Sequence, residues 1–225
     1  MARLNPVARR ALKRKAFRKP IADYLARVVE WDHSALKPVK DLVRIFLRLE
    51  QDEICPYCQR LIIPERRNMT EHIEHYLDKS HAEYRKFGFT ATNLVLACIG
   101  CNMTKTTRDL VVDGKAKPIH LTIAEAPFRW PHPYFDDITE SLHKAPGPVY
   151  SAIPGSLRQA ETEQMITDLK LDTLENAESH HGRLLAEQNR LWEEVNALMK
   201  QMTPENMAKL EPLHARLQRI SRELN

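Results

Sequence analysis

The spacing of hydrophobic residues predicts helices at both ends of the chain. Apolar side chains recur three and four positions apart over residues 21–29 and 41–51, which places them on one face of a helix. The pattern returns from residue 156, where it predicts a long helix and a last helix that starts at Pro204. Pro212 is expected to kink this last helix or delay its start. Because fewer than about three heptads are uninterrupted, we interpret these stripes as internal packing rather than a coiled coil with a partner.

The middle of the chain has a different pattern. Short apolar runs at residues 61–63 and 94–97 predict brief strands. Seven of the 14 prolines fall within residues 118–154, so long regular elements are not expected there. The predicted fold class is therefore α+β and mostly helical. We expect four regions: a basic arm (1–20), N-terminal helices (21–51), a core with a proline-rich meander (52–155) and a C-terminal helical region (156–225).

Composition and charge narrow the class of protein. The 225 residues are 43% hydrophobic and 28% charged, which is typical of globular proteins and excludes a disordered or collagen-like chain. No apolar run approaches about 18 residues and the first residues lack an apolar secretory signal, so we expect a cytoplasmic protein with no membrane partner. Residues 1–20 hold eight Lys and Arg and no acid, while the rest holds 26 bases and 30 acids. Such a basic arm could contact the phosphates of a nucleic acid. A transit peptide and a solvated tail are the alternative interpretations.

All four cysteines stand in two Cys-x-x-Cys pairs, Cys55/Cys58 and Cys98/Cys101. Two residues between paired thiolates let a tight turn direct both sulfurs at one Zn²⁺, and two pairs complete a four-thiolate site with no open position. A redox function is the alternative for either pair alone, but two pairs without a spare cysteine favour structural zinc. The 39 residues between the pairs exceed the roughly 15 to 20 of an ordinary zinc ribbon, so a further unit is inserted there.

The inserted segment carries a second set of chemically active residues, the pair Glu74-His75 followed by Asn93 and then Asn102. A carboxylate suits a hard cation, and an imidazole can accept a proton from water at neutral pH. Adjacent strand residues point to opposite faces, so Glu74 and His75 can serve one site only where a strand ends or bends. We expect Asn102 to begin a helix whose start is held by the cysteines, with its amide oxygen facing Glu74.

The motifs of residues 52–106 stand in a characteristic order: Cys-x-x-Cys, Ile73–Ser80, Asn93-Leu94 and Cys98-x-x-Cys101-Asn102-x-x-Lys105. This combination resembles the zinc-containing HNH endonucleases of the ββα-metal class. The resemblance implies a small ββα-metal HNH core in which His75 is the general base and Asn93 braces the loop that carries it. It also implies that Glu74 and Asn102 bind catalytic Mg²⁺ or Mn²⁺. Most members have Asp in place of Glu74 and many have His in place of Asn102, which we expect to change the metal preference only.

Two motifs outside the core resemble a narrower family. The segments His132–Asp137 and Met165–Asp172 are similar to the PtuB family, the HNH subunit of Septu and some retron antiphage systems, although Lys170 stands where glycine is expected. This resemblance implies a partner ATPase of the PtuA type and a role in antiviral defence. From the residues alone we interpret His132 and its acidic neighbours as a turn rather than a further metal site.

A single-metal HNH site would hydrolyse a phosphodiester of DNA or RNA by in-line attack of a water deprotonated by His75. Basic residues near it in sequence are candidates to hold flanking phosphates, which position a substrate without reading its bases. These candidates are Lys79, Arg85, Lys86, Lys105 and Arg108.

Two other functions fit the sequence less well. A metalloprotease is disfavoured, because His72 and His75 are three positions apart rather than the four of the His-Glu-x-x-His motif. A non-catalytic zinc module that binds nucleic acid or protein through the arm and the helical tail would share the cysteine site. That alternative gives no reason for Glu74, His75, Asn93 and Asn102 to occur together in this order.

Overall fold

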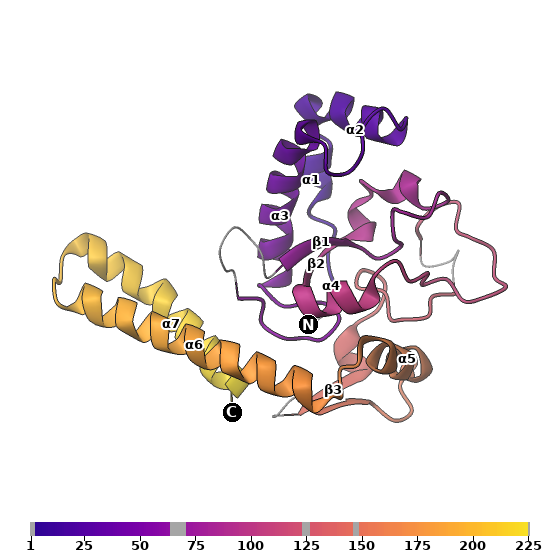
Figure 1. Ribbon diagram of the computed structural model, residues 1–225. Helices are drawn as coiled ribbons and strands as arrows, with labels where there is room; N and C mark the ends of the chain where they lie inside the picture. The colour runs from indigo at the N-terminus through magenta and orange to yellow at the C-terminus, as the bar shows by residue number, and fades with distance from the viewer. Residues whose placement is uncertain (1–2, 64–70, 123–126, 146–148, 225) are drawn as a thin grey trace. The chain divides into compact units, whose positions relative to one another are not determined.

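The computed structural model describes residues 3–63, 71–122, 127–145 and 149–224, with the backbone only for 174–180 (Figure 1). The chain contains both helices and strands and divides into two units. The first comprises Met1–His143 and Ser151–Leu169, and the second Lys144–Tyr150 and Lys170–Asn225. The helical region predicted from residue 156 therefore becomes a separate unit only at Lys170.

The first unit begins with α1 (Arg9–Leu12), α2 (Arg18–Leu25) and α3 (Lys37–Gln51). The helix α2 ends earlier than the hydrophobic pattern predicts, and Arg27 just beyond it has a left-handed backbone with φ of 62°. The helix α3 starts earlier than predicted, because Pro38 lies in its first turn, where no backbone N–H is needed.

The segment predicted as a basic arm is packed against α3. Leu4, Ala8 and Ala11 are buried, and the Val7 N–H donates a hydrogen bond to Glu50 of α3 at 3.3 Å. The basic side chains of this segment thus project from a backbone that the core holds in place.

The centre of the first unit is an antiparallel pair of strands followed by a short helix (Figure 1). The strand β1 (Glu71–His75) pairs with β2 (Leu94–Cys98), and α4 (Ile99–Lys105) follows directly and packs on both. The β2 residues are almost all buried, which confirms the strand predicted at 94–97. The other apolar run forms only an isolated bridge between Ile54 and Leu61.

Short elements complete the first unit. Two 3-10 helices, η4 (Arg85–Phe87) and η5 (Ala91–Asn93), lie between the strands, and η1 (Lys15–Phe17) and η2 (Ser34–Leu36) flank α2. After α4 come η6 (Ile138–Glu140) and α5 (Gln159–Leu169), and between them the strands β3 (Leu142–Ala145) and β4 (Val149–Ala152), which cross the boundary between the two units. No regular element between α4 and α5 exceeds four residues in the described part of the chain, as the prolines predict.

The second unit contains the helices α6 (Leu174–Met199) and α7 (Pro204–Leu224). They lie side by side, and their apolar stripes pack on each other as predicted (Figure 1). The buried residues of the stripes are Leu184, Leu191, Val195, Leu217 and Ile220. The last helix starts at Pro204 and continues through Pro212, so Pro212 does not delay its start.

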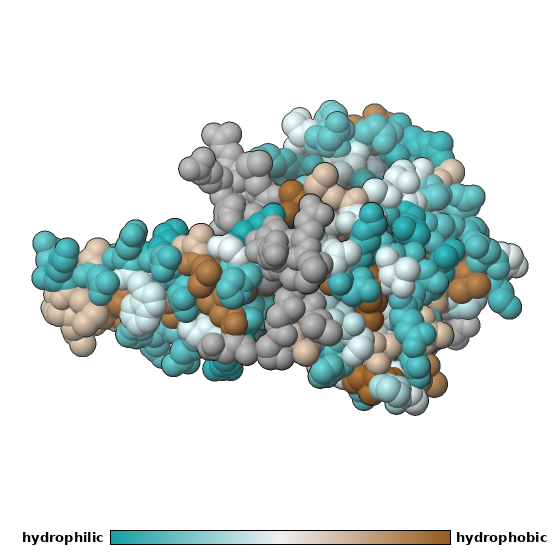
Figure 2. Space-filling model, turned by 60° about the horizontal axis from the view of Figure 1, so that its bottom comes forward, coloured by the Kyte–Doolittle hydropathy of each residue, from teal (hydrophilic) through white to brown (hydrophobic). Residues whose placement is uncertain are grey.

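Hydrophilic side chains dominate the surface in the view of Figure 2, where apolar residues are scattered among them. Among the described helices, none is both long enough and apolar enough to cross a bilayer.

Candidate functional site

The four cysteines form one cluster. Their Sγ atoms all lie within 4.8 Å of one another, and the Sγ atoms of Cys58 and Cys98 are 3.8 Å apart. A tetrahedral Zn²⁺ with Zn–S distances of about 2.3 Å requires Sγ–Sγ distances of about 3.8 Å, whereas a disulfide requires about 2 Å. None of the four cysteines is in a disulfide. The cluster can therefore hold a metal such as zinc.

Local hydrogen bonds build this cluster from two turns. The Cys55 N–H donates to the Arg60 carbonyl at 2.9 Å, which closes the turn that carries Cys55 and Cys58. Cys98 ends β2 and caps α4, because its Sγ accepts the Cys101 N–H at 3.4 Å. The cluster thus holds the start of α4, as expected. The helix begins at Ile99 rather than at Asn102, since the cap is Cys98 itself.

Glu74 faces α4 from β1. Its Oε1 lies 2.6 Å from the Nζ of Lys105, and both side chains are buried. Lys105 also donates to the His75 carbonyl at 3.0 Å. Burial raises the pKa of Glu74, while the Lys105 ammonium opposes this rise. Lys105 is therefore not a phosphate contact, because its side chain has 0% exposure and its charge is used inside the protein.

His75 is the last residue of β1, which meets the condition that the strand ends at the Glu-His pair. Its ring is buried, and its Nε2 lies 3.0 Å from the Gly88 carbonyl oxygen. Because a carbonyl only accepts hydrogen bonds, Nε2 carries the hydrogen and Nδ1 has the free lone pair. The Trp31 ring lies edge-on to the imidazole, with 4.5 Å between the centroids. Burial lowers the pKa of His75 to about 3, so the ring is neutral at physiological pH.

Gly88 and Trp31 are parts of this site that the sequence did not indicate. A Cβ added at Gly88 would lie 2.5 Å from the Tyr24 ring, so only glycine lets the chain pass close enough to present its carbonyl to His75. Little in the sequence indicated that these two residues belong to the site, because neither lies in the motif segments.

Asn93 is the last residue of η5, directly before β2. It is buried, its Oδ1 accepts the Leu77 N–H at 2.8 Å, and its Nδ2 donates to the carbonyls of Leu77 and Phe87 at 3.1 and 3.2 Å. Its amide therefore ties the backbone two residues after His75 to the backbone directly before Gly88.

Asn102 lies on α4, one turn before Lys105. Its side chain has no hydrogen-bond partner among the residues that the structure describes, which leaves the amide oxygen available. Within the same residues, the cysteine cluster is the only close group of three or more His, Cys, Asp or Glu side chains. Glu74 and Asn102 each carry a side-chain oxygen, and the Oε1 of Glu74 is already paired with Lys105.

Internal contacts engage two more of the predicted phosphate-binding residues. Arg85 donates to the carbonyls of Tyr24 and Val29 at 3.0 Å, and pairs with Glu30 at 2.8 Å. Arg108 pairs with Asp168 of α5 at 3.0 Å. By contrast, Lys79 and Lys86 form no ion pair within 4 Å in the described part of the chain, and their ammonium groups lie over aromatic rings.

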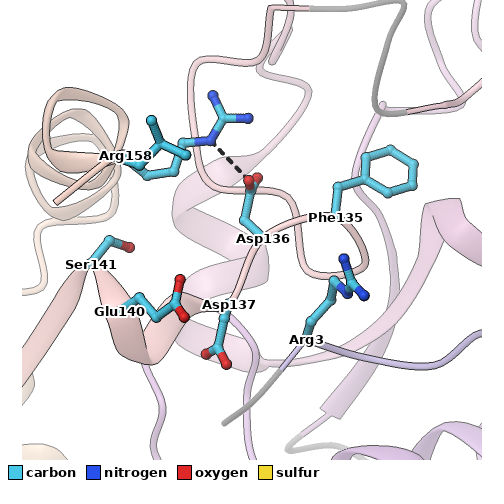
Figure 3. Close-up of a pocket in the computed structure, with 8 residues that line it drawn as sticks. Arg3, Phe135, Asp136, Asp137, Glu140, Ser141 and Arg158 are labelled. Carbon is cyan, nitrogen blue, oxygen red and sulfur yellow. Dashed lines mark hydrogen bonds and ion pairs between the residues drawn. The ribbon is translucent and has the colours of Figure 1, made fainter.

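The segment that begins at His132 forms a turn, as interpreted from the sequence. The His132 N–H donates to Asp136 at 2.7 Å, and the buried ring stacks on Phe135 with a centroid distance of 4.0 Å. Figure 3 shows Asp136 directed toward Arg158, the residue directly before α5, 2.8 Å away, while the Asp137 carboxylate points away from it. These residues border an open cavity of about 520 Å³. The turn thus holds the start of α5 through Arg158.

No protein-family model matches the chain, and no curated protein or solved structure matches it either.

Proposed function

We propose that this chain is a metal-dependent HNH endonuclease that hydrolyses phosphodiester bonds of nucleic acid, with a structural Zn²⁺ bound by its four cysteines. The observation that carries the proposal is the hydrogen bond between His75 Nε2 and the Gly88 carbonyl. It fixes the tautomer in which Nδ1 can accept a proton, at the end of a strand that also carries Glu74. Further support comes from the strand–strand–helix arrangement that the cysteine cluster fastens at α4.

In this mechanism His75 accepts a proton at Nδ1 from the water that attacks phosphorus, and Gly88 holds the ring in place through Nε2. Asn93 positions the backbone that carries both residues. Glu74 and Asn102 would hold Mg²⁺ or Mn²⁺, which when bound supplies positive charge that stabilises the negative charge developing on phosphate oxygens. The reaction ends with protonation of the leaving oxygen by solvent.

The test is a cleavage assay with Mg²⁺ or Mn²⁺ on single-stranded DNA, duplex DNA and RNA. His75→Ala is expected to abolish cleavage while folding and zinc content persist, because the zinc ligands are the four cysteines and the ring contacts Gly88 and Trp31 instead. His143→Ala, which removes an exposed histidine of β3, is the matched control and is expected to keep full activity. Equal cutting by His75→Ala and wild type would overturn the assignment of the base. The alternative of a non-catalytic zinc module predicts that none of the proteins cuts.

From the sequence resemblance we further propose that the nuclease acts with a PtuA-like ATPase in antiviral defence. Co-purification with an ATPase encoded beside its gene is the test, read together with cleavage in the presence and absence of that ATPase. A chain that stays separate from the ATPase and has full activity alone would contradict this part of the proposal.

A further inference from the structure

Two hollows in the surface of the first unit meet at Trp31. One, of about 300 Å³, lies between α2 and the loop after β1, and the other, of about 250 Å³, lies between α3 and β1. Trp31 lines both of them, and its ring also contacts His75. The two hollows therefore flank the side chain that covers the proposed base.

Positive charge lines both hollows. Their described lining residues include six Lys and Arg but only two acids, Glu30 and Asp41. Three of the six cations form ion pairs within 4 Å: Lys37, Arg44 and Arg85. The other three have no carboxylate within that distance in the described part of the chain: Arg27, Lys40 and Lys79.

Two of these unpaired cations lie on the Trp31 ring. The Nζ atoms of Lys40 and Lys79 are 5.4 and 5.7 Å from the ring centroid. Lys40 is half-buried, and among the described residues its Nζ donates only to the Trp31 carbonyl, at 2.8 Å. Burial lowers the pKa of Lys40, and the carboxylates of Asp32 and Asp41, neither within ion-pair distance of its ammonium, oppose this effect only in part. An anion beside Lys40 would stabilise the ammonium further.

The Trp31 ring is held in a fixed orientation. Phe89 and Tyr24 pack against it with centroid distances of 5.0 and 5.9 Å, while the residue remains partly exposed. An ordered, partly exposed aromatic ring flanked by basic residues is the arrangement with which proteins bind nucleic-acid strands without reading sequence.

We propose that Trp31, Lys40 and Lys79 form the binding surface for the nucleic-acid strand, with phosphates beside the two lysines and a base or sugar against the indole. The inference rests on the proposed nuclease function and specifies where its substrate binds. It differs from the prediction made from sequence proximity, because Trp31 and Lys40 both precede the first motif residue, Cys55, and Lys86 lines neither hollow.

The test measures binding rather than cleavage. The full chain is titrated, without Mg²⁺ or Mn²⁺, into a labelled single-stranded DNA of about 20 nucleotides at several salt concentrations. The double variant Lys40→Ala/Lys79→Ala is expected to bind at least about tenfold more weakly and to lower the slope of log affinity against log salt by about 1.4, or about 0.7 for each phosphate contact with a single strand. Trp31→Ala is expected to weaken binding about tenfold, and Trp31→Phe to restore part of the loss.

Lys86→Ala is the matched control, since it removes one exposed ammonium from a neighbouring position outside the hollows. Its affinity is expected to stay within about twofold of wild type. The lysine variants decide the question even if Trp31→Ala does not fold, because neither lysine is part of the core. An unchanged salt slope in the double variant, an equal loss in Lys86→Ala, or no binding by wild type would overturn the proposal.

The two proposals can fail separately. Lysine-dependent binding without any cleavage would keep this surface and refute the nuclease. Cleavage that depends on His75, with affinity and salt slope indifferent to Lys40 and Lys79, would keep the nuclease and refute this surface.

Discussion

The Nζ of Lys105 lies 2.6 Å from the Oε1 of Glu74, and both side chains are buried between α4 and β1. This ion pair joins the helix that carries Asn102 to the strand that carries Glu74 and His75. Removing one partner of a buried ion pair leaves an uncompensated charge in the core, which strongly lowers the free energy of unfolding. Replacing both partners by apolar residues changes it much less.

We therefore expect Lys105→Met to lower the free energy of unfolding by about 3–5 kcal/mol. Adding Glu74→Gln should recover part of this loss, because the buried carboxylate charge is then also removed. Urea denaturation of the two single variants and the double variant measures the coupling between the residues. If the double variant loses the sum of the single losses, Lys105 and Glu74 do not act as a pair.

Removal of the metal from the cysteine cluster should unfold the centre of the first unit. The chain is expected to contain about one Zn²⁺ per molecule, because one tetrahedral ion uses all four thiolates. A strong chelator, or Cys101→Ser, should release the metal and lower the melting temperature, since the cluster fastens α4 to the turn at Cys55. Metal analysis and thermal unfolding are the measurements. A chain that keeps its melting temperature after losing its metal would show that α4 does not depend on the cluster.

The sequence predicted features that depend on local spacing. The two Cys-x-x-Cys pairs indicated a shared metal site, and the apolar run at 94–97 indicated β2, because each pattern reports the geometry of a few consecutive residues. Lys105 was wrongly predicted to contact phosphate at the surface. Whether its side chain faces solvent or β1 depends on which side of the short helix α4 packs against the strand. The packing of α4 against β1 is a tertiary contact, which the spacing of residues along the sequence does not reveal.

The sequence patterns also did not predict contacts between segments that are far apart in the chain. Trp31 and His75 are 44 positions apart, and only the path of the chain between α2 and α3 brings the indole to the imidazole. The close approach of Gly88 to Tyr24 is of the same kind, because a glycine in a loop usually indicates a turn rather than a lack of space.

Gly88→Ala tests whether this close approach positions the base. The new methyl group would meet the Tyr24 ring at 2.5 Å, so either the ring or the backbone must move. We expect destabilisation of about 1–3 kcal/mol and a large loss of cleavage, because the carbonyl that orients His75 is displaced. Gly100→Ala is the matched control, since an added Cβ meets nothing within 4 Å there and alanine favours a helix such as α4. Cleavage by Gly88→Ala at the wild-type rate would contradict the role given to the Gly88 carbonyl.

Glu50 should make the stability of the first unit depend on pH. Burial raises the pKa of its carboxyl from 4.5 to about 7, although the Val7 N–H donates to it. As pH rises through this window, the unfolded chain loses the proton before the folded chain does, so stability falls until about pH 7 and is constant above. Glu50→Gln should thus raise the free energy of unfolding by about 1–2 kcal/mol at pH 8 and much less at pH 5, allowing for the partial exposure of this residue. Urea denaturation at both pH values measures the difference, with Glu83→Gln as the exposed control. A gain of the same size at pH 5 would show that packing, and not the titration of Glu50, causes it.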